Sequence, residues 1–94
     1  MTFEWDPKKA AGNFRKHGVT FEEAASVFVD PIARTFSDPD HSTSEHREVT
    51  IGHSTSGRII FVAHTERMAR HRIISARRAT PRERKQYEQS KSQR

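Results

Sequence analysis

The segment from His71 to Tyr87 joins a short strand directly to a capped helix, and this order constrains how the chain can fold. Its first half contains Ile73 and Ile74, and β-branched residues in so short an apolar run are typical of a strand. In its second half Thr80 is a favourable N-cap, and Pro81 suits the first helical position. The sequence therefore predicts a last strand that leads straight into a C-terminal helix.

This strand–helix junction is strongly basic. Glu83, which would complete a capping box with Thr80, is the only acidic residue among these six basic ones: Arg72, Arg77, Arg78, Arg82, Arg84 and Lys85. Arg77 closes the strand, and a guanidinium held in place there can bind phosphate with two hydrogen bonds and stabilise charge on a phosphoryl group. For the three basic residues of the helix, an ordinary solvated surface is the alternative interpretation.

The length and composition of the chain limit its class. Ninety-four residues suffice for one domain with one modest core. The chain contains no cysteine, so disulfides and thiolate chemistry are excluded, and a reducing cytosol fits. The N-terminal residues do not resemble a signal peptide, and the longest apolar run, residues 59–63, is too short to span a bilayer. We expect a soluble cytoplasmic domain over residues 1–94, without membrane contact and with a frayed tail over residues 89–94.

The charge is distributed unevenly along the chain. Residues 1–48 carry a formal charge of −3 and residues 49–94 a charge of +8, which together give the net charge of +5. A basic half on a small cytosolic domain favours a polyanionic partner, with nucleic acid as the first choice. An acidic protein would be attracted equally well, so charge alone does not separate the two.

Asp6 and Pro7 open the first predicted helix, as its N-cap and its first residue, and Gly18 follows its end. This helix is expected to direct three side chains toward the core: Ala10, Ala11 and Phe14. Lys16 and His17 lie at its C-terminal end, where the helix dipole favours their protonated forms. Ordinary capping charge is the alternative to a functional role for these two residues.

Thr20 opens a second predicted helix, in which Glu23 would complete another capping box. Apolar residues with the spacing of a helix face are expected to be buried: Phe21, Ala24, Ala25 and Phe28. Asp30 and Pro31 stop this helix, and we assign it no chemistry.

The rest of the chain predicts an α+β fold, in which an antiparallel meander of three or four strands lies between the two N-terminal helices and the C-terminal helix. Four segments are predicted to be strands: residues 33–38, 47–54, 58–65 and 71–78. Residues 58–65 are apolar on both faces, which indicates a central strand. Residues 38–45 form a polar loop, and residues 55–57 and 66–70 are expected to be turns.

If both hairpins keep an even register, Glu48 pairs with His64, and His64 pairs with Arg72. That would place a carboxylate, an imidazole and a guanidinium in one cross-strand row. A charge-balanced surface row is the alternative, and a slip of one residue would destroy the alignment. The same register places Arg77 on the opposite face of the sheet.

The six histidines do not have the spacing of a metal site, since no His-x-x-x-His pair and no cysteine occurs. A glycine-rich phosphate loop is also absent, so we expect neither a metal nor a cofactor. Tyr87 is the sole large apolar residue of the last helix. Two roles stay open for it: it pins the helix to the sheet, or it stacks on a nucleobase.

Segments along most of the chain match one known family: residues 3–8 (Phe-Glu-Trp-Asp-Pro-Lys), 13–24 (from Asn-Phe-Arg-Lys-His-Gly to Ala), 27–31, 47–52, 64–67 and 72–87. In this combination the chain resembles the BrnT family, the toxins of bacterial type II toxin–antitoxin modules. The resemblance implies a RelE-like fold and a metal-independent endoribonuclease that inhibits translation. It also implies a BrnA-like ribbon-helix-helix antitoxin, a toxin–antitoxin hetero-oligomer, and contact with operator DNA only through the antitoxin.

The resemblance also suggests site residues. It implies four candidates for catalysis: Arg77, Arg67, His17 and Lys16. The candidates for contact with RNA come instead from the basic segment and its aromatic residue: Arg72, Arg78, Arg82 and Tyr87. Cleaving RNA without a metal requires a base, a cation to stabilise the phosphorane and an acid, and these residue types supply all three. From the residues alone, a non-catalytic RNA-binding module and a basic protein-interaction domain remain alternatives to a ribonuclease.

Overall fold

The computed structural model describes residues 2–38 and 46–92. The elements follow in the order β1 (Phe3–Glu4), α1 (Pro7–His17), α2 (Phe21–Ser26), the 3₁₀ turn η1 (Val27–Val29), β2 (Arg34–Ser37), β3 (Arg47–His53), β4 (Ile59–Arg67), β5 (Arg70–Arg78) and α3 (Pro81–Ser92). The predicted loop over residues 38–45 lies almost wholly outside the described residues. The predicted α+β class and the three helices are confirmed, whereas α3 continues to Ser92 through part of the tail predicted to fray.

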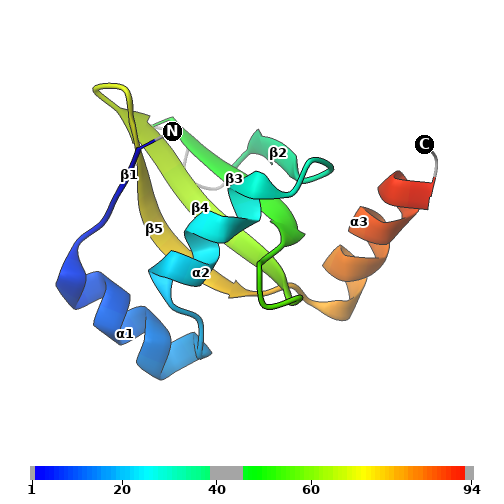
Figure 1. Ribbon diagram of the computed structural model, residues 1–94, viewed down its shortest axis with the longest axis horizontal. Coiled ribbons are helices and arrows are strands. Elements are labelled where there is room, and N and C mark those ends of the chain that lie inside the picture. The colour runs from blue at the N-terminus through cyan, green and yellow to red at the C-terminus, as the bar shows by residue number, and fades with distance from the viewer. Residues whose placement is uncertain (1, 39–45, 93–94) are drawn as a thin grey trace.

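The strands form one sheet in the order β1-β5-β4-β3-β2 (Figure 1). Strands β2 to β5 make the predicted antiparallel meander. The prediction of an all-antiparallel sheet with three or four strands is wrong, because β1 adds a fifth strand parallel to β5, with Phe3 opposite His71. A two-residue strand shows no alternation in the sequence, so its pattern could not reveal it.

The two faces of the sheet are covered by different helices. The larger core lies under α1 and α2 and contains Val19, Phe21, Ala24, Val27, Ile60, Val62, Ile73 and Ala76. A smaller core lies under α3 and contains Val49, Ile51 and Tyr87, with Ile32, Ile59 and Phe61 packed against it. Because successive residues of β4 alternate between these two cores, the prediction of a central strand that is apolar on both faces is confirmed.

Helix α1 has the predicted caps but a different buried face. The Asp6 side chain accepts a hydrogen bond from the Lys8 backbone N–H at 2.9 Å, and Gly18 has the left-handed φ of 69°. The prediction that Phe14 and Ala11 face the core is wrong: Phe14 is 54% exposed, and Ala11 is also exposed. A polar residue is buried in their place.

That residue is Asn13, which connects α1 to the sheet. Its Nδ2 donates to the backbone oxygens of Val19 at 3.0 Å and Ala76 at 2.8 Å, and its Oδ1 accepts from the Ala76 N–H at 3.0 Å. Because β1 pairs only with the beginning of β5, the amide of Asn13 satisfies the backbone of Ala76 as a neighbouring strand would. The helix therefore binds the sheet through three specific hydrogen bonds.

Helix α2 buries Phe21 and Ala24 as predicted, and Thr20 Oγ1 accepts from the Glu23 N–H at 3.0 Å. The other half of the predicted capping box does not form. The Glu23 carboxylate instead accepts from Arg58 and from the hydroxyls of Ser54 and Ser56. These bonds, with that from Arg58 the strongest, lower the pKa of Glu23 to about 2 and connect α2 to the β3–β4 turn.

The β4–β5 hairpin corrects two predictions of register. Its turn contains only Met68 and Ala69, both with positive φ, so the predicted five-residue turn over residues 66–70 is wrong. Glu48 does pair with His64. A bulge after Ala63, however, places His64 opposite Ile73, so the predicted pairing of His64 with Arg72 is wrong.

The imidazole of His64 lies inside the larger core, with 1% of the residue exposed. Its Nε2 lies 2.7 Å from Thr50 Oγ1, and its ring meets the ring of Phe28 edge-on with centroids 4.9 Å apart. Burial is the main cause that lowers the pKa of His64 to about 4, and the neighbouring His71 contributes. The neutral imidazole is therefore the form that the fold accommodates.

We expect the protein to lose stability as the pH falls from about 6.5 to about 4, because in this range His64 binds a proton in the unfolded chain but not in the folded chain. A pKa difference of this size corresponds to about 3 kcal/mol of unfolding free energy, present above this window and lost below it. Urea unfolding of wild type and His64→Gln at several pH values measures the effect. Equal pH dependence in both proteins would contradict it.

Candidate nucleic-acid interface

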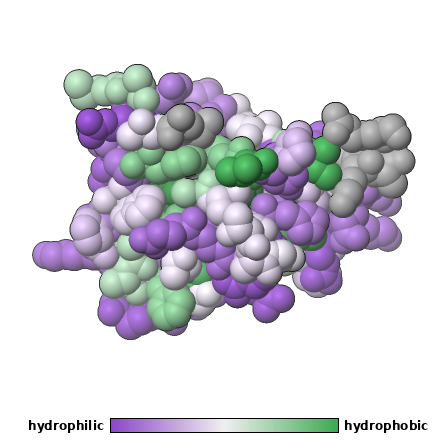
Figure 2. Space-filling model, viewed as in Figure 1, coloured by the Kyte–Doolittle hydropathy of each residue, from purple (hydrophilic) through white to green (hydrophobic). Residues whose placement is uncertain are grey.

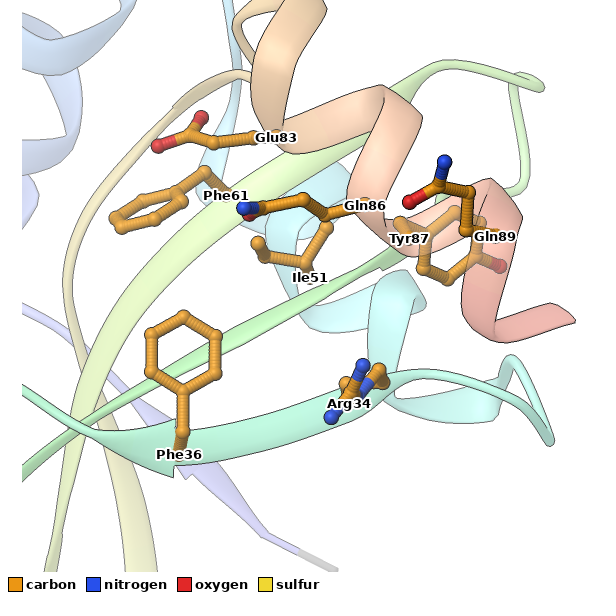
Figure 3. A pocket seen from close by; sticks show the side chains of 8 residues that line it. All are labelled: Arg34, Phe36, Ile51, Phe61, Glu83, Gln86, Tyr87 and Gln89. Carbon is orange, nitrogen blue, oxygen red and sulfur yellow. The ribbon is translucent and has the colours of Figure 1, made fainter.

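A groove lies between α3 and the part of the sheet formed by β2, β3 and β4. It has a volume of about 680 Å³ and is lined by Arg34, Phe36, Ile51, Phe61, Glu83, Gln86, Tyr87 and Gln89 (Figure 3). We call it the α3 groove. Its floor is apolar, whereas its walls carry a guanidinium, a carboxylate and two amides, so it offers both stacking surfaces and polar contacts.

The strand register builds one side of this groove. Arg34 of β2 lies opposite Ile51 of β3, Ile51 lies opposite Phe61 of β4, and Phe61 lies opposite Arg77 of β5. These four residues therefore form a cross-strand row on the face that α3 covers, with an arginine at each end. Phe36 stands two residues beyond Arg34 on β2 and is 45% exposed.

The guanidinium of Arg77 is held in place, as the sequence predicts. It lies over the ring of Phe61, 4.0 Å from the centroid, and its two terminal nitrogens donate to the two carboxylate oxygens of Glu83 at 2.8 and 2.9 Å. Glu83 also closes the predicted capping box with Thr80. The hydrogen bonds raise the pKa of Arg77 and lower that of Glu83, so both groups are charged and largely neutralise each other.

Tyr87 pins α3 to the sheet, and of its two possible roles this is the one the structure supports. It is 2% exposed, so the prediction that its ring stacks on an RNA base is wrong: the ring is covered by the protein. Its hydroxyl donates to Asp30 Oδ2, and His53 Nδ1 lies 3.0 Å from the same hydroxyl. The backbone N–H of His53 also donates to Asp30 Oδ2, at 2.8 Å.

This network determines which nitrogen of His53 can act as a base. Burial raises the pKa of Asp30, but the hydrogen bonds from Tyr87, His53 and Ile32 outweigh it and leave the pKa below its usual value. Burial and the bond to Asp30 raise the pKa of Tyr87, so the phenol keeps its proton and donates it to the carboxylate. The Tyr87 oxygen must then accept the proton on His53 Nδ1, and Nε2 is the proton-accepting nitrogen of neutral His53.

His53 lies next to the α3 groove but is not one of its lining residues. It follows Ile51 by two residues on β3, so it is on the same face, and it contacts Tyr87, which lines the groove. Its side chain is 39% exposed. The network therefore presents a partly exposed imidazole with a fixed tautomer beside a groove that carries Arg34.

The four residues predicted to be catalytic do not come together. Lys16 and His17 end α1, which packs on the face opposite α3. Arg67 ends β4, six residues beyond Phe61, which corresponds to about 20 Å along the strand. Arg77 pairs with Phe61 and so lies far from Arg67. At most one of these three locations can be the centre of the reaction.

The arginines predicted to contact RNA are also dispersed. Arg72 donates to Glu4 at 3.2 Å near the β4–β5 hairpin, where Arg70 lies 3.6 Å from the same carboxylate. Arg78 pairs with Ile60 and so lies on the α1–α2 face, whereas Arg82 is exposed on α3. Hydrophilic side chains surround smaller apolar groups on the face shown in Figure 2.

Two further findings concern metal binding and membrane-spanning helices. Within residues 2–38 and 46–92, no group of three or more His, Cys, Asp or Glu residues is arranged to hold a metal ion, and His41 lies outside these ranges. No helix in the described part of the chain is long and apolar enough to cross a membrane.

Comparison with known proteins identifies the family. The family model described as ribonuclease toxin, BrnT, of type II toxin-antitoxin system matches residues 5–83. The chain belongs to the BrnT family. The crystal structure of the Brucella abortus ribonuclease toxin BrnT resembles this one with a TM-score of 0.67 and 25% sequence identity, over 85% of this chain and 97% of that one. A comparison with curated protein sequences found no match.

The resemblance inferred from the sequence is thus confirmed, and this BrnT-family chain is a relative of ribonuclease toxins that work with an antitoxin. The sequence interpretation missed three residues of the groove region: Arg34, Phe36 and His53. The alternation of residues 47–53 contained a signal for His53, because it placed this residue on the same face as Val49 and Ile51. The partner of His53, Asp30, was interpreted as a helix stop alone.

Proposed function

We propose that this BrnT-family protein is a metal-independent endoribonuclease, which cleaves RNA at the α3 groove and thereby inhibits translation. The main support is the Asp30–Tyr87–His53 network, which fixes a proton-accepting nitrogen beside a groove that contains Arg34. A base and a cation on one face of the sheet are two of the three groups that RNA cleavage without a metal requires.

In the proposed reaction, His53 Nε2 removes the proton of a ribose 2′-hydroxyl, and the 2′ oxygen attacks the adjacent phosphorus. The bond from phosphorus to the 5′ oxygen breaks, and that oxygen takes a proton from the histidinium formed at His53 or from water. The products carry a 2′,3′-cyclic phosphate and a 5′-hydroxyl. Nδ1 stays bonded to Tyr87, and the negative charge of Asp30 behind it stabilises the histidinium.

Arg34 is the cation best placed for this reaction. Arg34 lies on β2, next to the strand β3 that carries His53. It pairs with Ile51, which precedes His53 by two residues, so the Cα atoms of Arg34 and His53 are about 8 Å apart. A guanidinium on a strand can reach the phosphate beside His53 and stabilise the charge of the phosphorane. Arg77 remains a second candidate for this role, from the other end of the same row.

We expect the purified protein to cleave RNA in the presence of excess EDTA, because the proposed chemistry uses only side chains. Gel analysis of a labelled RNA gives the rate, and treatment of the products with a phosphatase and a kinase identifies the cyclic phosphate and the 5′-hydroxyl. Salt-dependent RNA binding without cleavage would instead favour the non-catalytic RNA-binding module. Absence of any salt-dependent RNA binding would favour the basic protein-interaction domain.

We further propose that the antitoxin of this system is BrnA-like, with a ribbon-helix-helix domain that binds operator DNA on behalf of a hetero-oligomeric complex. The family supports a partner of the antitoxin class. The excess of positive charge, +5 over the chain, favours an acidic toxin-binding segment in that partner.

A further inference from the structure

We propose that the α3 groove binds one unpaired nucleobase of single-stranded RNA between Phe36 and Phe61. This inference rests on the proposed ribonuclease function and names the form of RNA that the same site accepts. It makes Phe36 a substrate-binding residue and restricts cleavage to unpaired positions.

Two phenyl rings border the groove. Phe36 comes from β2 and Phe61 from β4 (Figure 3). On the intervening strand β3, Val49 lies opposite Phe36 and Ile51 lies opposite Phe61. Strands β2 and β4 are two strand spacings apart, about 10 Å, and the two rings are also offset by two residues along the strands, which leaves room for a flat ring between them. Phe36 is 45% exposed although it is large and apolar, so the protein leaves a stacking surface uncovered at this point.

The rest of the lining suits a nucleotide. The volume of about 680 Å³ is within the usual range of small-molecule sites, roughly 300–1,000 Å³. Gln86 and Gln89 reach the groove from α3, and their amides can both donate to and accept from the edge of a base. Arg34 lies at the β2 side and supplies positive charge for a phosphate of the same strand (Figure 3).

The charge of the site favours RNA over an apolar peptide. The chain carries a net charge of +5, which attracts a polyanion, and Arg34 lines the groove, whereas Arg77 is largely neutralised by Glu83. Aromatic rings interspersed with cations are the usual binding surface for single-stranded nucleic acid. A paired base is already stacked on both sides and cannot enter, so a duplex of the same sequence should be a poor ligand.

The test compares Phe36→Ala, Phe36→Trp and Phe14→Ala. Phe14 is the matched control, because it is 54% exposed but lies on α1, outside the groove lining. Fluorescence anisotropy with a labelled 2′-O-methyl oligonucleotide, which cannot be cleaved, measures binding alone. We expect Phe36→Ala to bind roughly tenfold more weakly, Phe36→Trp to bind at least as well as wild type, and Phe14→Ala to be unchanged.

The same variants are assayed for cleavage of an all-ribose oligonucleotide, where Phe36→Ala should raise KM and leave kcat nearly unchanged. Unchanged oligonucleotide affinity and KM in Phe36→Ala would overturn the proposal while leaving the ribonuclease function intact. Weaker oligonucleotide binding by Phe36→Ala in a protein that never cleaves would support the groove and refute the ribonuclease. If Phe36→Ala weakens antitoxin binding and not RNA binding, the groove is an antitoxin site and the proposal is wrong.

Discussion

Replacing His53 by alanine should lower the rate of RNA cleavage by about 10²–10⁴-fold, the usual contribution of a positioned general base. The expectation follows from three hydrogen bonds. Tyr87 donates to Asp30, the His53 backbone donates to Asp30, and the Nδ1 of His53 bonds the Tyr87 hydroxyl. Removing the imidazole leaves the fold intact, because the side chain is 39% exposed and Tyr87 keeps its bond to Asp30.

Cleavage by His53→Ala should be compared with cleavage by His17→Ala and Lys16→Ala. Both control residues were predicted from the sequence to transfer protons, and both lie at the end of α1, on the face opposite the groove. Each control should therefore retain activity within a few-fold of wild type. Wild-type cleavage by His53→Ala, with a large loss in His17→Ala, would move the reaction to the end of α1.

Variants of Arg77 and Glu83 in the same cleavage assay decide whether Arg77 takes part in the reaction or only anchors α3. If the guanidinium of Arg77 stabilises the phosphorane, Arg77→Ala and Arg77→Lys should both lower the rate of RNA cleavage by about a hundredfold, because lysine lacks the planar pair of donors. If Arg77 only anchors α3 through Glu83, then Glu83→Gln should cause a similar loss, since it removes the same ion pair. Circular dichroism on each variant separates both effects from unfolding.

Local chemistry made the helix ends predictable from the sequence. Asp6, Thr20 and Thr80 each cap a helix as expected, and Gly18 ends α1 with positive φ. These signals depend only on neighbouring residues, so they survive in any fold. The two apolar faces of residues 58–65 also predicted that β4 is a central strand.

Long-range contacts could not be predicted in the same way. The bulge after Ala63 shifts β5 by one residue, and nothing in the local pattern of residues 63–74 signals it. The candidate site was missed for a related reason, because Asp30, His53 and Tyr87 are brought together from three distant segments. Because Asp30 precedes Pro31, the sequence indicated only that it ends a helix. Its second role, as the hydrogen-bond acceptor for His53 and Tyr87, could not be read from its neighbours.

Asn13 shows most clearly how a polar residue can organise a core. Asn13 and Phe14 are consecutive residues and lie about 100° apart around the helix axis, so burial of one turns the other away, and the hydrophobic pattern favoured burial of the phenylalanine. The structure buries the amide, because the edge of β5 beyond β1 needs partners for the N–H and C=O of Ala76, and only a polar side chain supplies them. A ring at this position would leave both groups unpaired.

We expect Asn13→Ala to lower the free energy of unfolding by about 3–5 kcal/mol, since it removes three hydrogen bonds and leaves buried backbone groups of Val19 and Ala76 without partners. Asn13→Asp should be at least as damaging: it keeps the acceptor for the Ala76 N–H but loses both donors and buries a charge. Phe14→Ala, on the same helix, should cost under about 1 kcal/mol because that ring is half-exposed. Urea unfolding of the three variants at pH 7.5 compares them directly, and a loss from Asn13→Ala no larger than that from Phe14→Ala would show that the amide does not connect α1 to the sheet in solution.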